Sequence, residues 1–137
     1  YIIVTQFGQG INLSQYLKFK ESKFTEDRAK NIMKQMFEAI NYLHSQGFSH
    51  RDINLDNVLI DKFDKIMIVD FGSASKFNNE FTVNSKTEYT CFDNPEAILK
   101  HPTLGTADDI WSLGVFLYYL ITGKPPYTGI ITTLFLQ

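Results

Sequence analysis

Apolar residues recur at every third or fourth position between residues 26 and 46, which is the spacing of one face of an α-helix. Thr25 precedes this stretch as a candidate N-cap, and Gly47 stands where a C-terminal cap is expected. The pattern therefore predicts an amphipathic helix of about 20 residues. The stretch from Thr106 to Ile121 is apolar on nearly every face, which predicts a second helix, buried in the core.

Shorter runs of β-forming residues predict strands around these helices. Residues 57–60 and 65–69 flank a turn-prone segment, and together they predict a hairpin. Residues 1–5 predict another short strand, and residues 13–19 predict a short helix. Residues 71–94 have no lasting periodicity and are rich in Ser, Thr and Asn, which is typical of a functional loop. This order of elements predicts a mainly helical α+β fold.

The amino-acid composition indicates a globular protein and excludes several classes of partner. A chain of 137 residues with 44% hydrophobic and 20% charged residues is typical of one globular unit. The net charge of -2 gives no basic surface, and the longest apolar run is too short to cross a bilayer, so we expect neither nucleic acid nor a membrane as a partner. The single cysteine, Cys91, fits a reducing, intracellular and cytoplasmic setting. The strand-like opening without a Met suggests a sequence that begins inside a domain.

Three oxygen-bearing side chains gather around the predicted hairpin. Asp52 and Asn57 lie five residues apart in the loop before the first strand, and Asp70 follows the second strand. Magnesium prefers hard oxygen ligands and keeps several waters, so one or two protein groups with phosphate oxygens make the expected site. A nearby carboxylate that accepts a hydroxyl proton would complete a phosphoryl-transfer site.

Residues 50–57 (His-Arg-Asp-Ile-Asn-Leu-Asp-Asn) and 70–72 (Asp-Phe-Gly) resemble the catalytic-loop and magnesium-binding signatures of the eukaryotic-type protein kinase family. Residues 94–96 (Asn-Pro-Glu) stand where Ala-Pro-Glu is usual, and residues 109–115 resemble the start of the family's central buried helix. The resemblance implies that residues 1–137 are a partial kinase domain. It would be the C-terminal lobe, with a small β-hairpin at the active-site cleft and without the N-terminal lobe.

The resemblance also implies roles for the residues of the site. Asp52 would be the catalytic base, and Asn57 and Asp70 would hold the Mg²⁺ ions that bridge the phosphates of ATP. Leu59 would lie under the adenine ring. Asn54 occupies the position where Ser/Thr kinases usually carry a Lys beside the transferring phosphate, and Asn brings no positive charge.

Two further roles concern the segment from Asp70 to Glu96, which corresponds to the family's activation segment. Arg51 would pair with a phosphate in this segment, and Asp109 would anchor the backbone of the catalytic loop. The candidate phosphate acceptors are hydroxyl-bearing side chains: Thr82, Ser85, Thr87, Tyr89 and Thr90.

The implied function is ATP-dependent phosphoryl transfer to Ser/Thr hydroxyls of protein substrates, because Asp56 before Asn57 matches the Ser/Thr pattern. The alternative is a pseudokinase or a truncated regulatory module without catalysis, which Asn54 favours. A second departure is Tyr89, which stands where a Thr is usual. Residues 1–137 contain no glycine-rich phosphate loop and no Val-Ala-Ile-Lys strand, so we expect the 137-residue chain alone to be inactive.

Other residues have structural interpretations. We expect His50 to pack in the core, and Trp111 likewise. His44 is expected at the end of the first long helix, either as a solvated residue or as one favoured there by the helix dipole. For Cys91 we expect the behaviour of a small buried hydrophobic residue rather than a reactive thiol.

Overall fold

The computed structural model describes residues 2, 4–20, 23–77, 81 and 88–127. Within them the chain is a small α+β protein, as predicted. Its elements in order are β1 (Ile11–Asn12), α1 (Leu13–Lys20), α2 (Glu26–Ser45), β2 (Phe48–Ser49), β3 (Val58–Ile60), β4 (Ile66–Ile68), β5 (Ser75–Lys76), α3 (Pro95–Ile98) and α4 (Gly105–Thr122).

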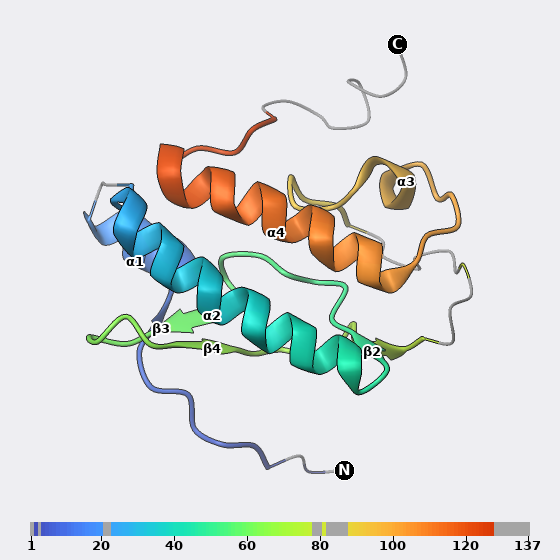
Figure 1. Ribbon diagram of the computed structural model, residues 1–137, viewed down its shortest axis with the longest axis horizontal. Helices are drawn as coiled ribbons and strands as arrows, with labels where there is room; N and C mark the ends of the chain where they lie inside the picture. The colour runs from blue at the N-terminus through green and yellow to red at the C-terminus, as the bar shows by residue number, and fades with distance from the viewer. Residues whose placement is uncertain (1, 3, 21–22, 78–80, 82–87, 128–137) are drawn as a thin grey trace.

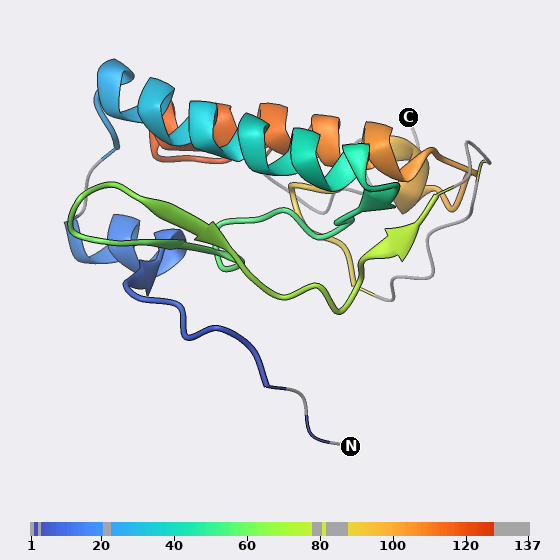
Figure 2. The ribbon, with the colours of Figure 1, turned by 60° about the horizontal axis from the view of Figure 1, so that its bottom comes forward.

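Helices α2 and α4 lie side by side and run in opposite directions (Figure 1). At one end Phe24 donates its backbone N–H to the carbonyl of Leu120, and at the other His44 contacts Asp109. Figure 2 shows these two helices as one layer, with α1 and the β3–β4 hairpin on the other side of the molecule. Both predicted helices are therefore confirmed, and their antiparallel contact forms the frame of the fold.

The core lies between the two long helices and the hairpin. Its buried side chains come from residues 13–60 and 92–120, and its largest fully buried members include Phe116, Leu13, Ile32, Met36, Ile40, Ile53, Leu113 and Leu120. Trp111 and Cys91 pack at the edge of this cluster, partly buried. The described residues contain no helix long and apolar enough to cross a membrane.

The strands form two small sheets. In the first sheet β3 pairs on one side with β1 and on the other with β4, and both pairs are antiparallel. The predicted hairpin is therefore confirmed. Of the strand predicted for residues 1–5, residues 1 and 3 lie outside the described residues, and residues 2, 4 and 5 are not in a strand. The β2–β5 pair was not predicted, since each of its strands has only two residues.

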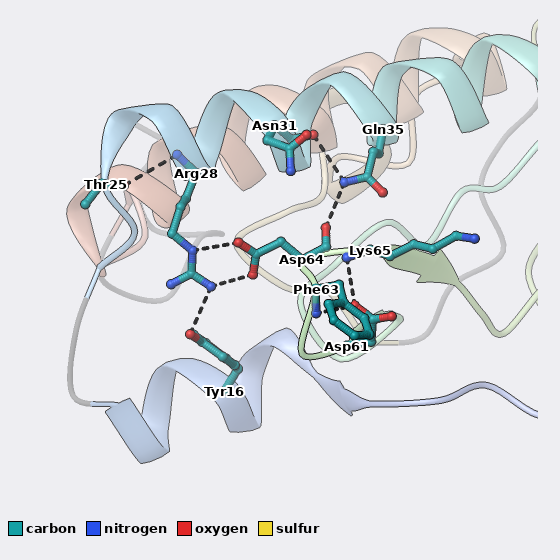
Figure 3. Close-up of polar contacts among 9 residues, drawn as sticks. All are labelled: Tyr16, Thr25, Arg28, Asn31, Gln35, Asp61, Phe63, Asp64 and Lys65. Carbon is teal, nitrogen blue, oxygen red and sulfur yellow. Dashed lines mark hydrogen bonds and ion pairs between the residues drawn. The ribbon is translucent and has the colours of Figure 1, made fainter.

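The hairpin turn is held against α2 by two side chains of that helix (Figure 3). Arg28 donates from Nε to Oδ2 of Asp64 at 2.9 Å and from Nη2 to the Tyr16 hydroxyl at 3.0 Å. Gln35 donates to the carbonyl of Asp64 at 2.8 Å and accepts the N–H of Ile66 at 3.1 Å. These contacts fix the closed end of the hairpin, and its open end faces the candidate site.

Candidate active site

The catalytic-loop backbone is held from α4 by one buried carboxylate. Oδ2 of Asp109 accepts the N–H of His50 at 2.9 Å, and Oδ1 accepts the N–H of Arg51 at 2.7 Å. Arg51 has a φ of 63°, a left-handed conformation that is uncommon for a residue with a side chain. The anchoring role expected for Asp109 is confirmed, and it keeps this strained loop in place.

His44 lies in the last turn of α2, as predicted, but it is not a solvated residue. Its Nε2 lies 2.7 Å from Oδ2 of Asp109, and its side chain is 18% exposed rather than solvated. His44 thus completes the set of partners around the Asp109 carboxylate. The two residues are 65 positions apart, and no local pattern in the sequence signals such a contact.

Asp52 and Asn57 are brought into direct contact. Nδ2 of Asn57 donates to Oδ2 of Asp52 at 2.8 Å and to the Asp52 carbonyl at 2.9 Å. Both bonds use the amide nitrogen of Asn57, and among the described residues no donor is bonded to its Oδ1. The arrangement orients one oxygen of Asn57 for another partner and holds the Asp52 carboxylate in a fixed direction.

The hairpin brings the residue that precedes Asp70 into contact with Asn57. Val69 donates its N–H to the carbonyl of Asn57 at 2.9 Å, so Asp70 directly follows a residue bonded to Asn57. Asp70 is exposed and has a φ of 61°, and its Oδ1 accepts the N–H of Gly72 at 3.1 Å. No group of three or more His, Cys, Asp or Glu side chains forms a metal site in the described part of the chain. Two protein oxygens, from Asn57 and Asp70, nevertheless suit Mg²⁺, which takes its remaining ligands from water and phosphate.

Asn54 uses its side chain within the loop. Its Oδ1 accepts the N–H of Asp56 at 2.9 Å and the N–H of Asn57 at 3.1 Å. Its Nδ2 lies 3.3 Å from the carbonyl of Asp52 and donates to it. Asn54 therefore shapes the turn between Asp52 and Asn57, whereas the expected role beside a transferring phosphate needs a side chain that extends out of the loop.

Leu59 lies half-buried in β3 and meets the N-terminal segment. A Cβ added to Gly8 would overlap Cδ1 of Leu59 and lie 3.4 Å from Sδ of Met67. The fold thus brings Gly8 of the N-terminal segment against Leu59, the predicted floor of the adenine site. A glycine at this position permits that close approach.

His50 is fully buried, as expected. Its Nδ1 accepts the N–H of Asp52 at 3.3 Å, and the ring of Phe71 lies 4.9 Å away between centroids. Burial lowers the pKa of His50, and the nearby carboxylate of Asp109 opposes that shift only in part. A neutral imidazole with these contacts supports the loop and links it to the Asp70-Phe71-Gly72 segment.

The candidate phosphate acceptors Thr82, Ser85 and Thr87 lie outside the described residues. Thr90 lies within them, and its hydroxyl donates to Oδ2 of Asp93 at 3.0 Å. A phosphate on Thr90 would therefore face a carboxylate, which is unfavourable. Burial raises the pKa of the neighbouring Cys91 thiol, which fits a structural rather than a reactive residue.

Comparisons with known proteins identify the family to which this fold and site belong. The chain belongs to the protein kinase family: the family model described as protein kinase domain matches residues 1–134. Sperm motility kinase 2B of Mus musculus is 34% identical over 125 residues, which are 91% of this chain and 26% of that protein.

Two further relatives show the same relation. Sperm motility kinase Z of Mus musculus is 37% identical over 132 residues, covering 93% of this chain and 25% of the relative. Protein kinase kin1 of Schizosaccharomyces pombe is 32% identical over 127 residues, covering 93% of this chain and 14% of the relative. The chain spans about a quarter or less of the length of these proteins.

Proposed function

We propose that residues 1–137 belong to the C-terminal lobe of a protein serine/threonine kinase, which transfers a phosphoryl group from ATP to Ser/Thr hydroxyls of protein substrates. The observation that carries this proposal is the contact between the Asn57 amide and the Asp52 carboxylate at 2.8 Å, together with the bond at 2.9 Å from the N–H of Val69, the residue before Asp70, to the Asn57 carbonyl. A carboxylate base beside two hard oxygen ligands suits phosphoryl transfer.

Each side chain would have a distinct task. Asp52 would accept the proton of the attacking hydroxyl, and the Asn57 contact would keep its carboxylate directed at the acceptor. Asn57 and Asp70 would hold Mg²⁺, which neutralises phosphate charge when bound. Leu59 would support the adenine ring, and Arg51 would pair with a phosphate of the activation segment. The preference for Ser/Thr is supported by Asp56, which precedes Asn57.

The test compares three substitutions of the same chemical kind in the full-length protein. Asp52→Asn is expected to reduce phosphate transfer to casein by about 10³-fold or more, with nearly unchanged ATP binding, because it removes only the base. Asp70→Asn is expected to weaken magnesium-dependent ATP binding, because it removes an anionic ligand. Asp27→Asn, at an exposed position of α2, is the control and should change neither quantity. Equal effects of the first two variants on ATP binding would contradict these roles.

A second candidate function is that of a pseudokinase, a binding or regulatory module without catalysis. The observation that favours it is the Asn54 side chain, which is committed to bonds with Asp56 and Asn57 inside the loop. Asn54→Lys distinguishes the two candidates. In a kinase limited by the missing charge, this change should raise kcat for casein phosphorylation. If the full-length protein binds magnesium-ATP but transfers no phosphate with either residue, the pseudokinase proposal replaces the enzyme.

A further inference from the structure

Asn94 stands where alanine is usual before Pro-Glu, and its amide makes two buried hydrogen bonds. Oδ1 accepts the N–H of Ala97 at 2.9 Å, which caps the first turn of α3. Nδ2 donates to Oδ1 of Asp108 at 2.8 Å. An alanine side chain can make neither contact, so Asn94 ties the start of α3 to the first turn of α4.

Asp108 is itself buried, with 6% of its surface exposed. Its second oxygen accepts the hydroxyl of Thr103 at 3.0 Å. Burial raises its pKa, while the hydrogen bonds from Thr103 and Asn94 and the charge of Arg51 oppose that rise. A buried carboxylate is costly unless hydrogen bonds surround it, so its two donors indicate a specific tie rather than simple packing.

A third tie lies one turn further along α4. Ser112, which is also buried, donates its hydroxyl to the carbonyl of Phe92 at 2.8 Å. We call Asn94, Thr103, Asp108 and Ser112 the buried bracket. It joins residues 92–103 to α4 at three points, while the adjacent Asp109 binds the catalytic-loop backbone.

We infer that the buried bracket is a positioning device for the acceptor side of the site: it fixes residues 92–98 relative to the catalytic loop, so that a protein acceptor is presented to Asp52. The inference rests on the proposed function. Asp108 binds residues 94 and 103, and the adjacent Asp109 binds the backbone of the catalytic loop. Both contacts start from the first turns of α4, so this helix fixes residues 92–98 and the catalytic loop relative to each other. Helix α3 has only four residues, and a helix that short is not stable by itself. Its position therefore depends on these ties.

An exchange of the amide and the carboxylate tests the Asn94–Asp108 contact directly. Asn94→Asp alone places two carboxylates together, which opposes the contact. The double variant Asn94→Asp with Asp108→Asn restores it with reversed polarity: Asp would still cap α3, and Asn would donate to it and accept from Thr103. Asn94→Ser keeps a capping oxygen but is too short to reach Asp108. Asn41→Asp, at an exposed position of α2, is the matched control.

The full-length variants are assayed for phosphorylation of casein and for amide hydrogen exchange of residues 92–98. For Asn94→Asp we expect KM for casein to rise about tenfold, with KM for ATP unchanged, because only the acceptor side is displaced. Exchange in residues 92–98 should accelerate, and the double variant should return both quantities towards those of the wild type. Asn94→Ser should show the same selectivity for casein, and Asn41→Asp no change.

Three results would overturn the inference: unchanged exchange and casein KM in Asn94→Asp, an equal rise of both KM values, or no recovery in the double variant. If Asn94→Asp does not fold, the double variant and Asn94→Ser decide the same question. If the wild-type protein phosphorylates nothing, the proposed function is wrong. Hydrogen exchange then remains as the test of whether the buried bracket fixes residues 92–98. Faster exchange that the double variant reverses would support it, and unchanged exchange would overturn it.

Discussion

Two glycines of α4 show how differently single positions are constrained. A Cβ added to Gly105 would overlap Oγ of Ser49 and lie 2.7 Å from Nε of Arg51, whereas a Cβ on Gly114 would meet nothing within 4 Å. Gly105 therefore lets the catalytic-loop arginine lie against the first turn of α4. Gly114 is exposed within the same helix, where a glycine only lowers helix stability.

We therefore expect opposite effects from the same substitution at these two positions. Gly105→Ala should lower the free energy of unfolding by about 1–3 kcal/mol, because the new methyl group displaces Ser49 or Arg51. Gly114→Ala should raise it by about 0.5–1 kcal/mol through helix propensity. Urea denaturation of both variants measures the difference. If Gly105→Ala left the free energy of unfolding unchanged, the start of α4 could shift to accommodate the methyl group and would not constrain Arg51.

At the scale of elements, the site depends on two separate supports. The backbone of the catalytic loop is hydrogen-bonded to Asp109 of α4. The hairpin between Asn57 and Asp70 is instead bonded at its turn to side chains of α2. The guanidinium of Arg28 also lies 4.8 Å above the ring of Phe24, so Arg28 contacts the loop between α1 and α2 as well as the hairpin turn. A hairpin with three paired residues per strand has little stability by itself, so the contacts of Arg28 and Gln35 determine its orientation.

The Arg28–Asp64 contact is expected to stabilise the hairpin measurably. In a double-mutant cycle of Arg28→Met and Asp64→Asn, the coupling should be about 1 kcal/mol, because the two-bond contact is screened where Arg28 is partly exposed. Asn tolerates the left-handed backbone of Asp64, whose φ is 60°. Hydrogen exchange in residues 58–68 should accelerate in both single variants.

The exposed Glu26–Lys30 pair of α2 offers a control within the same helix. Lys30→Met should leave the free energy of unfolding and the exchange of the hairpin unchanged, because solvent screens this pair. A coupling near zero between Arg28 and Asp64 would show that Gln35 and the pairing with β1 suffice to hold the hairpin.

At the scale of the whole molecule, two carboxylates give opposite contributions to the pH dependence of folding. Hydrogen bonding from Arg28 lowers the pKa of Asp64, so its contribution is present above the ordinary value of 3.8 and is lost as the pH falls. Burial raises the pKa of Asp108 above 3.8. Its contribution is therefore present at low pH and is lost as the pH rises through the raised value.

Asp108→Asn isolates the second contribution. An amide can accept from Asn94 and donate to the Thr103 hydroxyl, so both contacts survive while the charge is removed. Relative to the wild type, the variant should gain stability as the pH rises above 3.8, and the gain should level off above the folded-state pKa. Urea unfolding of both proteins between about pH 4 and pH 7 measures this difference. A difference that is constant with pH would contradict a raised pKa.

The sequence by itself determined the elements that depend on local physics. Helix α2 follows from its apolar stripe and from Thr25, which accepts the N–H of Arg28. Helix α4 follows from its apolar run and ends at Gly123, which has the left-handed conformation expected of a cap. The hairpin follows from two β-forming runs on either side of a turn. Motif spacing was also sufficient to find the family, and the placing of Asn57 against Asp52 agrees with that spacing.

Only the tertiary structure decided which distant side chains meet. The contacts of His44 with Asp109 and of Asn94 with Asp108 join residues 65 and 14 positions apart, and neither follows from periodicity or capping. The two-residue strands β2 and β5 likewise exist only because the fold aligns them. Local patterns report the conformation of a segment. The partner of a buried polar group is instead chosen by packing, since any donor brought near it relieves the cost of its burial.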